Sequence, residues 1–225
     1  MNYWYLGAAS IVFTLALAWS KWKRKMVAAV LFKALASLSF VILGILSFQH
    51  AIDKTSALYL LVGLIFGAVG DVLLNVCHLV KESPFVFFLG GVSFFVGHIL
   101  YLVVLIPQAA SYLWPAIGAG ILSAALILFF LHRKVKTEQL LFLESLSYMI
   151  VVSLMASFSV FGLIAKSGDP ARILRAIGGL LFLASDTMLF ARMIRKEKTP
   201  AVLGFLLLIT YYPAQCLIAM SMQHM

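Results

Sequence analysis

The sequence predicts an all-α, polytopic membrane protein with eight transmembrane helices. Of its 225 residues, 64% are hydrophobic and only 11% are charged, whereas soluble domains contain about 45–50% apolar and about 25% charged residues. Its basic residues form short runs between long apolar stretches, as loops at a membrane surface do. Each span needs about 20 apolar residues, so residues 1–225 form a single integral membrane domain with no room for a second, soluble one.

Eight apolar stretches are predicted to span the membrane, at residues 3–20, 26–48, 56–80, 84–106, 112–132, 139–164, 171–192 and 200–221. The first lacks the preceding positive charge of a signal peptide and is therefore expected to remain uncleaved. The uncharged stretch 83–131 is too long for one span, and Pro107 together with Trp114-Pro115 predicts the turn that divides it. The run 167–170, Ser-Gly-Asp-Pro, predicts another break.

The distribution of positive charge predicts that both termini lie outside. In that orientation the inner loops carry 12 of the 17 lysines and arginines and the outer side carries 4, with Lys33 left within a span. The net charge of +9 is then explained by loops facing anionic lipid, and no nucleic acid partner is expected. Short loops favour a bacterial inner (cell) membrane, and the absence of a polar helix-dimer seam favours a monomer.

Ionisable side chains inside the predicted spans cost about 2.5–3.5 kcal/mol each and so need a structural or chemical reason. They are Lys33, Asp71, His78, His98, Glu144 and Asp186. Asp71 and Asp186 lie 115 residues apart in similar strings, and both fall in the inner half of their spans. This similarity suggests a parallel pseudo-repeat of four plus four spans, which would bring the two acids near a common axis.

Two acids at similar depth favour a catalytic interpretation. Two carboxyl groups in a low dielectric cannot both ionise cheaply, so one is expected to stay protonated beside the other's carboxylate. The alternative is that each acid is a buried hydrogen-bonding group that ties helices together.

Further polar residues share helix faces with these acids or lie at similar depth. His98 and Tyr101 are three residues apart, and Tyr211 and Gln215 are four apart, so each pair shares one helix face. Both pairs are candidates for a site, although a packing histidine and a helix kinked at Pro213 would explain them structurally.

Lys33 and Asn75 have two interpretations each. Lys33 could extend its amine to the interface, or it could pair with a phosphate or with one of the two aspartates. Asn75 shares a face with Asp71 and, with His78 and His98, raises the alternative of zinc. Nothing in the histidine spacing matches a zinc motif, so no metal is expected.

Several strings, in this order and spacing, resemble the YhhN family. They are Lys33 in a Lys-x-Leu-Ala string, Gly70-Asp71-Val72-Leu73-Leu74, Gly97-His98 with Tyr101, Tyr148 with Met155, Ser185-Asp186, and Thr210-Tyr211-Tyr212 with Gln215. That family contains the lysoplasmalogenases, including the animal transmembrane protein 86 group. One departure is Ala34, where the family often has proline.

The resemblance implies a reaction on a lysophospholipid. Lysoplasmalogenases hydrolyse the vinyl ether bond of lysoplasmenyl-ethanolamine or -choline to a fatty aldehyde and glycerophosphoethanolamine or glycerophosphocholine, without a cofactor. Asp71 and Asp186 would then be the catalytic acid and base, in an order that the sequence does not reveal. The expected substrate-binding residues are Lys33 at the phosphate and, around the reacting bond, Asn75, His98, Tyr101, Tyr148, Tyr211 and Gln215.

Two other functions fit the same membrane pattern. A proton-coupled lipid or small-molecule transporter would use the two aspartates as proton sites and yield no chemical product. A zinc-dependent lipid amidase of the alkaline ceramidase type would be inhibited by chelators.

Overall fold

A computed structural model describes residues 3–77, 83–132, 139–194 and 200–225. The described chain forms eight α-helices, as the sequence predicts. They are α1 (Trp4–Trp22), α2 (Met26–His50), α3 (Lys54–Cys77), α4 (Pro84–Gln108), α5 (Leu113–His132), α6 (Gln139–Ala165), α7 (Pro170–Ile194) and α8 (Ala201–Ser221), with two short 3₁₀ turns, η1 (Ala110–Tyr112) and η2 (Met222–His224). The all-α class is therefore confirmed.

The predicted breaks within the chain are confirmed, with small shifts in position. Pro107 lies inside α4, and the connection to α5 is made by η1. Pro115 falls in the first turn of α5, where a missing backbone N–H has no partner to lose. Between α6 and α7, Gly168 adopts a φ of +85°, which residues with a Cβ rarely adopt.

In the part of the chain that the structure describes, seven stretches are long and apolar enough to cross a membrane: Met26–His50, Lys54–Cys77, Pro84–Gln108, Ala110–Leu131, Leu146–Ala165, Pro170–Met193 and Ala201–His224. These seven indicate an integral membrane protein. Helix α1 is not among them; it carries Lys21 and three tryptophans within its 19 residues. An eighth crossing and the orientation of the chain stay predictions.

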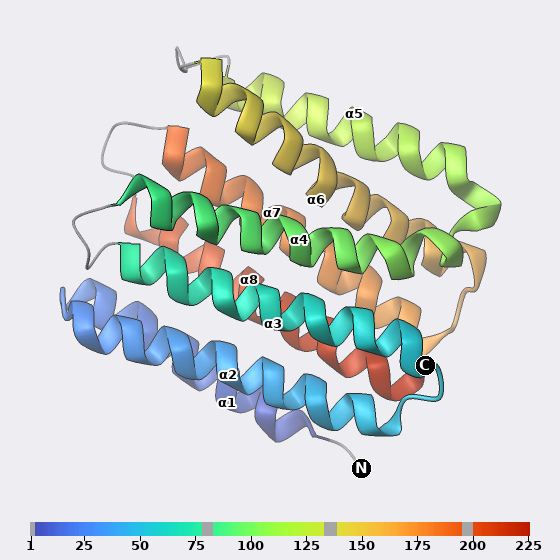
Figure 1. The fold of residues 1–225 in the computed structure, drawn as a ribbon, viewed down its shortest axis with the longest axis horizontal. Coiled ribbons are helices and arrows are strands. Elements are labelled where there is room, and N and C mark those ends of the chain that lie inside the picture. Colours follow the sequence, from blue (N-terminus) through green and yellow to red (C-terminus); the bar gives the residue numbers. More distant parts are fainter. Residues whose placement is uncertain (1–2, 78–82, 133–138, 195–199) are drawn as a thin grey trace.

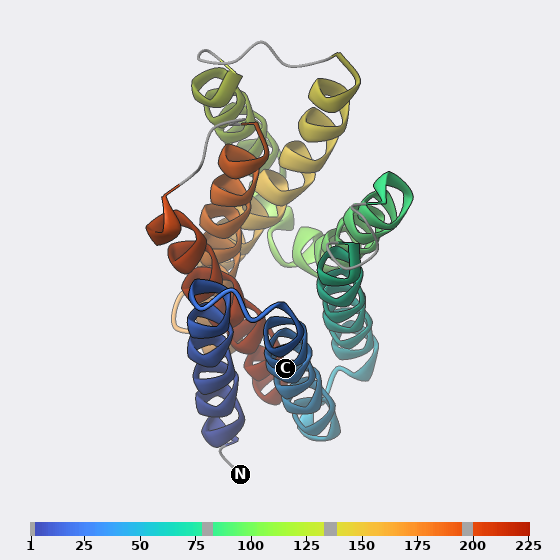
Figure 2. The ribbon, with the colours of Figure 1, turned by 90° about the vertical axis from the view of Figure 1, so that its left-hand side faces the viewer.

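The helices run back and forth along the long axis of the molecule (Figure 1), and both marked termini lie at the same end. Consecutive helices pack as pairs, α1 with α2, α3 with α4, α5 with α6 and α7 with α8. Helix α2 also contacts α3 and α8, whereas α6 also contacts α7 and α4. Seen from one end (Figure 2), the α3–α4 and α7–α8 pairs flank the molecule between α1–α2 and α5–α6.

Apolar side chains cover the outside of the bundle, as lipid requires. Leu31, Val103 and Phe130 are among the exposed large hydrophobic residues, whereas Asp71, His98 and Asp186 are buried. The chain thus buries these three ionisable groups between helices and presents apolar groups outward.

Helices α3 and α4 approach closely where Gly63 faces Gly97. A Cβ on Gly97 would lie 3.0 Å from the backbone oxygen of Gly63, whereas a Cβ on Gly91, one and a half turns earlier on α4, would meet nothing within 4 Å. Backbone cannot yield as a flexible side chain can, so Gly97→Ala is expected to destabilise the fold by about 1–3 kcal/mol.

Gly91→Ala is the matched control for this prediction. It should leave stability unchanged or raise it by up to about 1 kcal/mol, because alanine is the better helix former. Thermal unfolding of the two purified variants compares them directly. Equal unfolding temperatures would show that the close approach of α3 and α4 is not required.

Candidate active site

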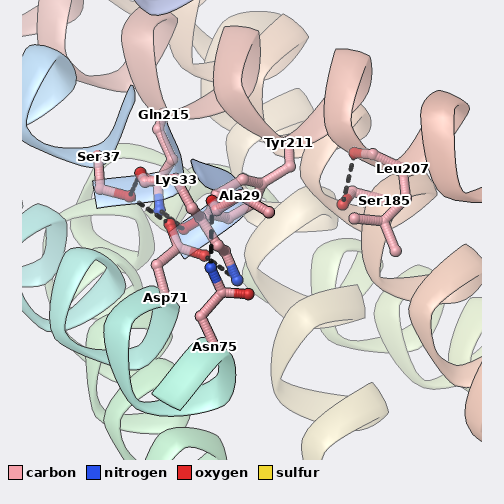
Figure 3. A network of polar contacts seen from close by, with 9 residues as sticks. All are labelled: Ala29, Lys33, Ser37, Asp71, Asn75, Ser185, Leu207, Tyr211 and Gln215. Carbon is pink, nitrogen blue, oxygen red and sulfur yellow. Dashed lines mark hydrogen bonds and ion pairs between the residues drawn. The ribbon is translucent and has the colours of Figure 1, made fainter. Parts of the chain in front are cut away.

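Asp71 on α3 is the centre of the first polar cluster (Figure 3). Its side chain points toward α2 and α8. The Lys33 ammonium lies 3.1 Å from Oδ1, and Oδ2 accepts hydrogen bonds from the Ser37 hydroxyl at 2.7 Å and the Tyr211 hydroxyl at 2.9 Å. One cation and two hydroxyl donors therefore converge on this carboxyl, the arrangement of a charge-assisted hydrogen-bond network.

The position of Lys33 decides between its two predicted interpretations. Its side chain is only 13% exposed and pairs with Asp71, so it does not extend to the interface. Asn75, one turn after Asp71, is buried and reaches the Ala29 carbonyl oxygen at 3.5 Å. Asn75 thus lies at the edge of the cluster and helps to hold α3 against α2.

Asp186 on α7 is the centre of a second cluster with different surroundings. It is 4% exposed and accepts a hydrogen bond from the Tyr148 hydroxyl of α6 at 2.9 Å. The His98 Nε2 atom of α4 lies 3.8 Å from Oδ2. Among the described residues, no lysine or arginine comes within ion-pair distance of Asp186. Burial without a cation favours the neutral acid over the carboxylate.

The backbone fixes which nitrogen of His98 carries a proton. Nδ1 lies 2.6 Å from the Phe94 carbonyl oxygen, and a carbonyl can only accept, so Nδ1 is the donor. In the neutral ring, Nε2 is then an acceptor, and within the described part of the chain it has no hydrogen-bond partner. A protonated Asp186, or a water molecule, is the kind of donor that this lone pair requires.

A buried hydrogen-bond chain extends the Asp71 cluster, and the ring of Phe182 lies between the two clusters. The Tyr101 hydroxyl donates to Gln215 Oε1 at 2.9 Å, and Gln215 Nε2 donates to the Tyr211 hydroxyl at 3.2 Å, which in turn donates to Asp71. The Phe182 ring lies 4.6 Å from the His98 ring and 5.4 Å from the Tyr211 ring, measured between centroids. The structure therefore gathers residues from α2, α3, α4, α6, α7 and α8 around one region.

Two ionisable residues of the predicted spans lie outside the described residues: His78, which was also a candidate zinc ligand, and the side chain of Glu144. Among the side chains that are described, no three from histidine, cysteine, aspartate and glutamate come close enough to share a metal ion.

The sequence of the region that builds both clusters matches a known protein family. Residues 26–222 match the sequence model of the YhhN family. The chain belongs to the YhhN family. The resemblance seen in the motifs is thus confirmed, and the family is associated with lysoplasmalogenase activity. Comparisons with curated proteins and with solved structures gave no match.

The YhhN match covers α2 to α8 and therefore contains every residue of both clusters. Helix α1 lies before the matched range. The candidate site is accordingly built entirely from the part of the chain that defines the family.

Three parts of this YhhN site were not singled out by sequence reasoning. Ser37 follows Lys33 by four residues, and this spacing on one helix face was the signal that could have identified it. Phe182 and the carbonyl of Phe94 carry no sequence signal, because one is an ordinary apolar residue and the other acts through its backbone.

Proposed function

We propose that this YhhN protein is a lysoplasmalogenase, an ether hydrolase that cleaves the vinyl ether bond of lysoplasmenyl-ethanolamine or lysoplasmenyl-choline. The products are a fatty aldehyde and glycerophosphoethanolamine or glycerophosphocholine. The observation that carries the proposal is a pair of buried carboxyl groups in opposite surroundings. Asp71 has a lysine 3.1 Å away, whereas Asp186 has a tyrosine hydroxyl and a histidine beside it.

Hydrolysis of a vinyl ether needs an acid first and a base second. Proton transfer to the β-carbon of the double bond creates an oxocarbenium ion, and water then adds to the carbon that bears the ether oxygen. Glycosidases solve a related problem with two carboxyl groups whose environments separate their roles. The different partners of Asp71 and Asp186 support the same division of labour here.

In the proposed reaction Asp186 is the acid. It gives its proton to the β-carbon and becomes a carboxylate that stabilises the adjacent cation. Asp71 takes a proton from the attacking water, which yields a hemiacetal. The hemiacetal hydroxyl then returns a proton to Asp186, the bond between carbon and ether oxygen breaks, and Asp71 protonates the leaving alcohol. One water is consumed, both carboxyls regain their starting states, and no cofactor takes part.

The surrounding residues have supporting roles in this proposal. His98 and Tyr148 orient the carboxyl of Asp186, and Tyr211 orients that of Asp71. Tyr101 and Gln215 hold Tyr211 in place through the hydrogen-bond chain. Lys33 pairs with Asp71 in the free protein, and its proposed contact with the substrate phosphate would add to that role. Asn75 completes the substrate-binding set at the edge of the site.

We also propose that α1 makes an eighth crossing and that both termini lie outside, in a bacterial inner membrane. The arrangement supports a four-plus-four repeat, because Lys33 and Tyr148 are 115 residues apart, as are Asp71 and Asp186. In each half, a residue of the second helix contacts the aspartate of the third. A monomer embedded in lipid would then take a lysophospholipid from the bilayer.

Tyr148→Phe is expected to lower kcat about 10-fold. It removes one hydrogen bond to the carboxylate that Asp186 becomes as it gives up its proton, and hydrogen bonds to charged groups contribute about 1.5–3 kcal/mol. Aldehyde release at saturating substrate measures the effect. Tyr59→Phe, at an exposed position on α3, is the matched control and should retain full activity. Unchanged turnover in Tyr148→Phe would remove Tyr148 from the site.

The proposed activity is tested by aldehyde release from 1-alkenyl-lysophosphatidylethanolamine with purified protein, with and without EDTA. We expect release in both conditions, and none from the 1-alkyl analogue, whose saturated ether has no double bond to protonate. Release that EDTA abolishes would favour a zinc-dependent reaction, as in the lipid amidase alternative. Folded protein that releases no aldehyde would contradict the proposal and favour a transporter.

A further inference from the structure

Arg175 on α7 is a buried charge that the proposed reaction does not use. It lies five residues after the start of α7 at Pro170 and three turns before Asp186, and it is only 4% exposed. Within the described residues, neither its Nε nor its Nη1 atom has a hydrogen-bond partner, and no carboxylate lies within ion-pair distance. A buried charge without a partner costs several kcal/mol, so this site calls for a compensating group.

Arg175 is one of the residues that line a small cavity among five helices. The other lining residues are Leu60, Tyr101, Leu105, Met155 and Ile218, and the cavity has a volume of about 10 Å³. That volume accommodates one water-sized species. The other lining side chains are apolar except for Tyr101, whose hydroxyl proton is already donated to Gln215, so an anion would find its polar partner at Arg175.

The charges near Arg175 favour an anion as that ligand. Asp169 is already shared by Lys166, whose Nζ lies 3.2 Å away, and by Arg172, whose Nε lies 3.8 Å away. Arg172 also donates to the carbonyl oxygens of Gln108 and Gly162. Two cations therefore share one carboxylate at this end of α7, and Arg175, three residues after Arg172, has no carboxylate within ion-pair distance among the described residues.

We infer that Arg175 and its cavity form a binding site for a small monovalent anion, with chloride as the natural occupant. The cavity is too small for phosphate, sulfate or a carboxylate metabolite. Water would fill the volume but leave the charge of Arg175 uncompensated. Tyr101 lines the cavity and donates to Gln215, so the bound anion would adjoin the outer end of the hydrogen-bond chain that reaches Asp71.

The test compares unfolding temperatures of the full-length protein in detergent as chloride replaces gluconate at constant ionic strength. We expect a saturable rise of about 2–6 °C when chloride exceeds its dissociation constant tenfold. Arg175→Gln should abolish this dependence on chloride. Arg172→Gln, three residues earlier on the same helix, should keep it, whatever its own unfolding temperature.

A second measurement does not depend on the variants. Crystals grown in bromide should show an anomalous peak within hydrogen-bond distance of the Arg175 guanidinium. Identical unfolding temperatures in chloride and gluconate, together with no such peak, would overturn the inference in favour of water. A chloride response that persists in Arg175→Gln would overturn it as well, because the anion would then bind elsewhere. Neither outcome depends on whether the protein hydrolyses lysoplasmalogens.

Discussion

Asp186→Asn is expected to lower aldehyde release from a lysoplasmalogen by about 10²–10⁴-fold, the usual contribution of general acid–base catalysis. An amide cannot give a proton to the β-carbon, yet it has nearly the same shape and can still accept from the Tyr148 hydroxyl, which lies 2.9 Å from Asp186. The loss should therefore appear in kcat, with little change in KM. Initial rates over a range of substrate concentrations measure both.

The control for this prediction compares the unfolding temperatures of the variant and the wild type. Asp186→Asn should unfold at the temperature of the wild type or above, because it removes a buried acid without removing volume. An Asp186→Asn protein that keeps more than half of the wild-type rate would show that another group supplies the proton. If Asp186→Asn loses both its activity and its fold, the test passes to Asp186→Glu, which keeps a carboxyl group at this position.

Lys33→Met is expected to destabilise the protein by about 3–5 kcal/mol, because it leaves the Asp71 carboxylate buried without its cation. The side chain of Asp71 is 3% exposed and lies 3.1 Å from the lysine ammonium, so water cannot replace that charge. Methionine keeps the length and apolar character of the lysine stem. Thermal or denaturant unfolding in one detergent measures the loss.

The double variant Lys33→Met/Asp71→Asn separates the ion pair from packing. It should recover most of the stability lost in Lys33→Met, because no buried charge is then left unpaired. Simple addition of the two single effects would mean that Lys33 and Asp71 do not interact in the folded protein. The double variant is expected to be inactive in either case, since it lacks the proposed base.

Helix number and helix ends were predictable because apolar length is a direct physical requirement of the bilayer. The predicted span at 84–106 and the helix at Pro84–Gln108 differ only where Pro107 continues the helix. Proline was interpreted as the start of the turn. Pro107 lacks the N–H that would bond to the carbonyl of Val103, but the helix continues past it by one residue and ends at Gln108.

The candidate site was predictable in its residues but not in their pairing. Intramembrane charge is costly, so Asp71, Asp186, His98 and Lys33 could be selected from the sequence. Lys33 pairs with Asp71 because of how α2 packs against α3. No local sequence pattern predicts that packing. The burial of Arg175 was missed for the same reason: it was counted among the four charges of the outer side, whereas its side chain is packed between helices and is 4% exposed.

The most direct test of the two-carboxylate reaction is hydrolysis of 1-alkenyl-lysophosphatidylethanolamine by the wild-type protein in D₂O. The released aldehyde would be reduced in place and analysed by mass spectrometry. We expect one deuterium per turnover on the carbon next to the carbonyl, because a proton exchangeable with solvent is delivered there from Asp186. Aldehyde without deuterium at that carbon, or folded protein that releases no aldehyde, would contradict this reaction.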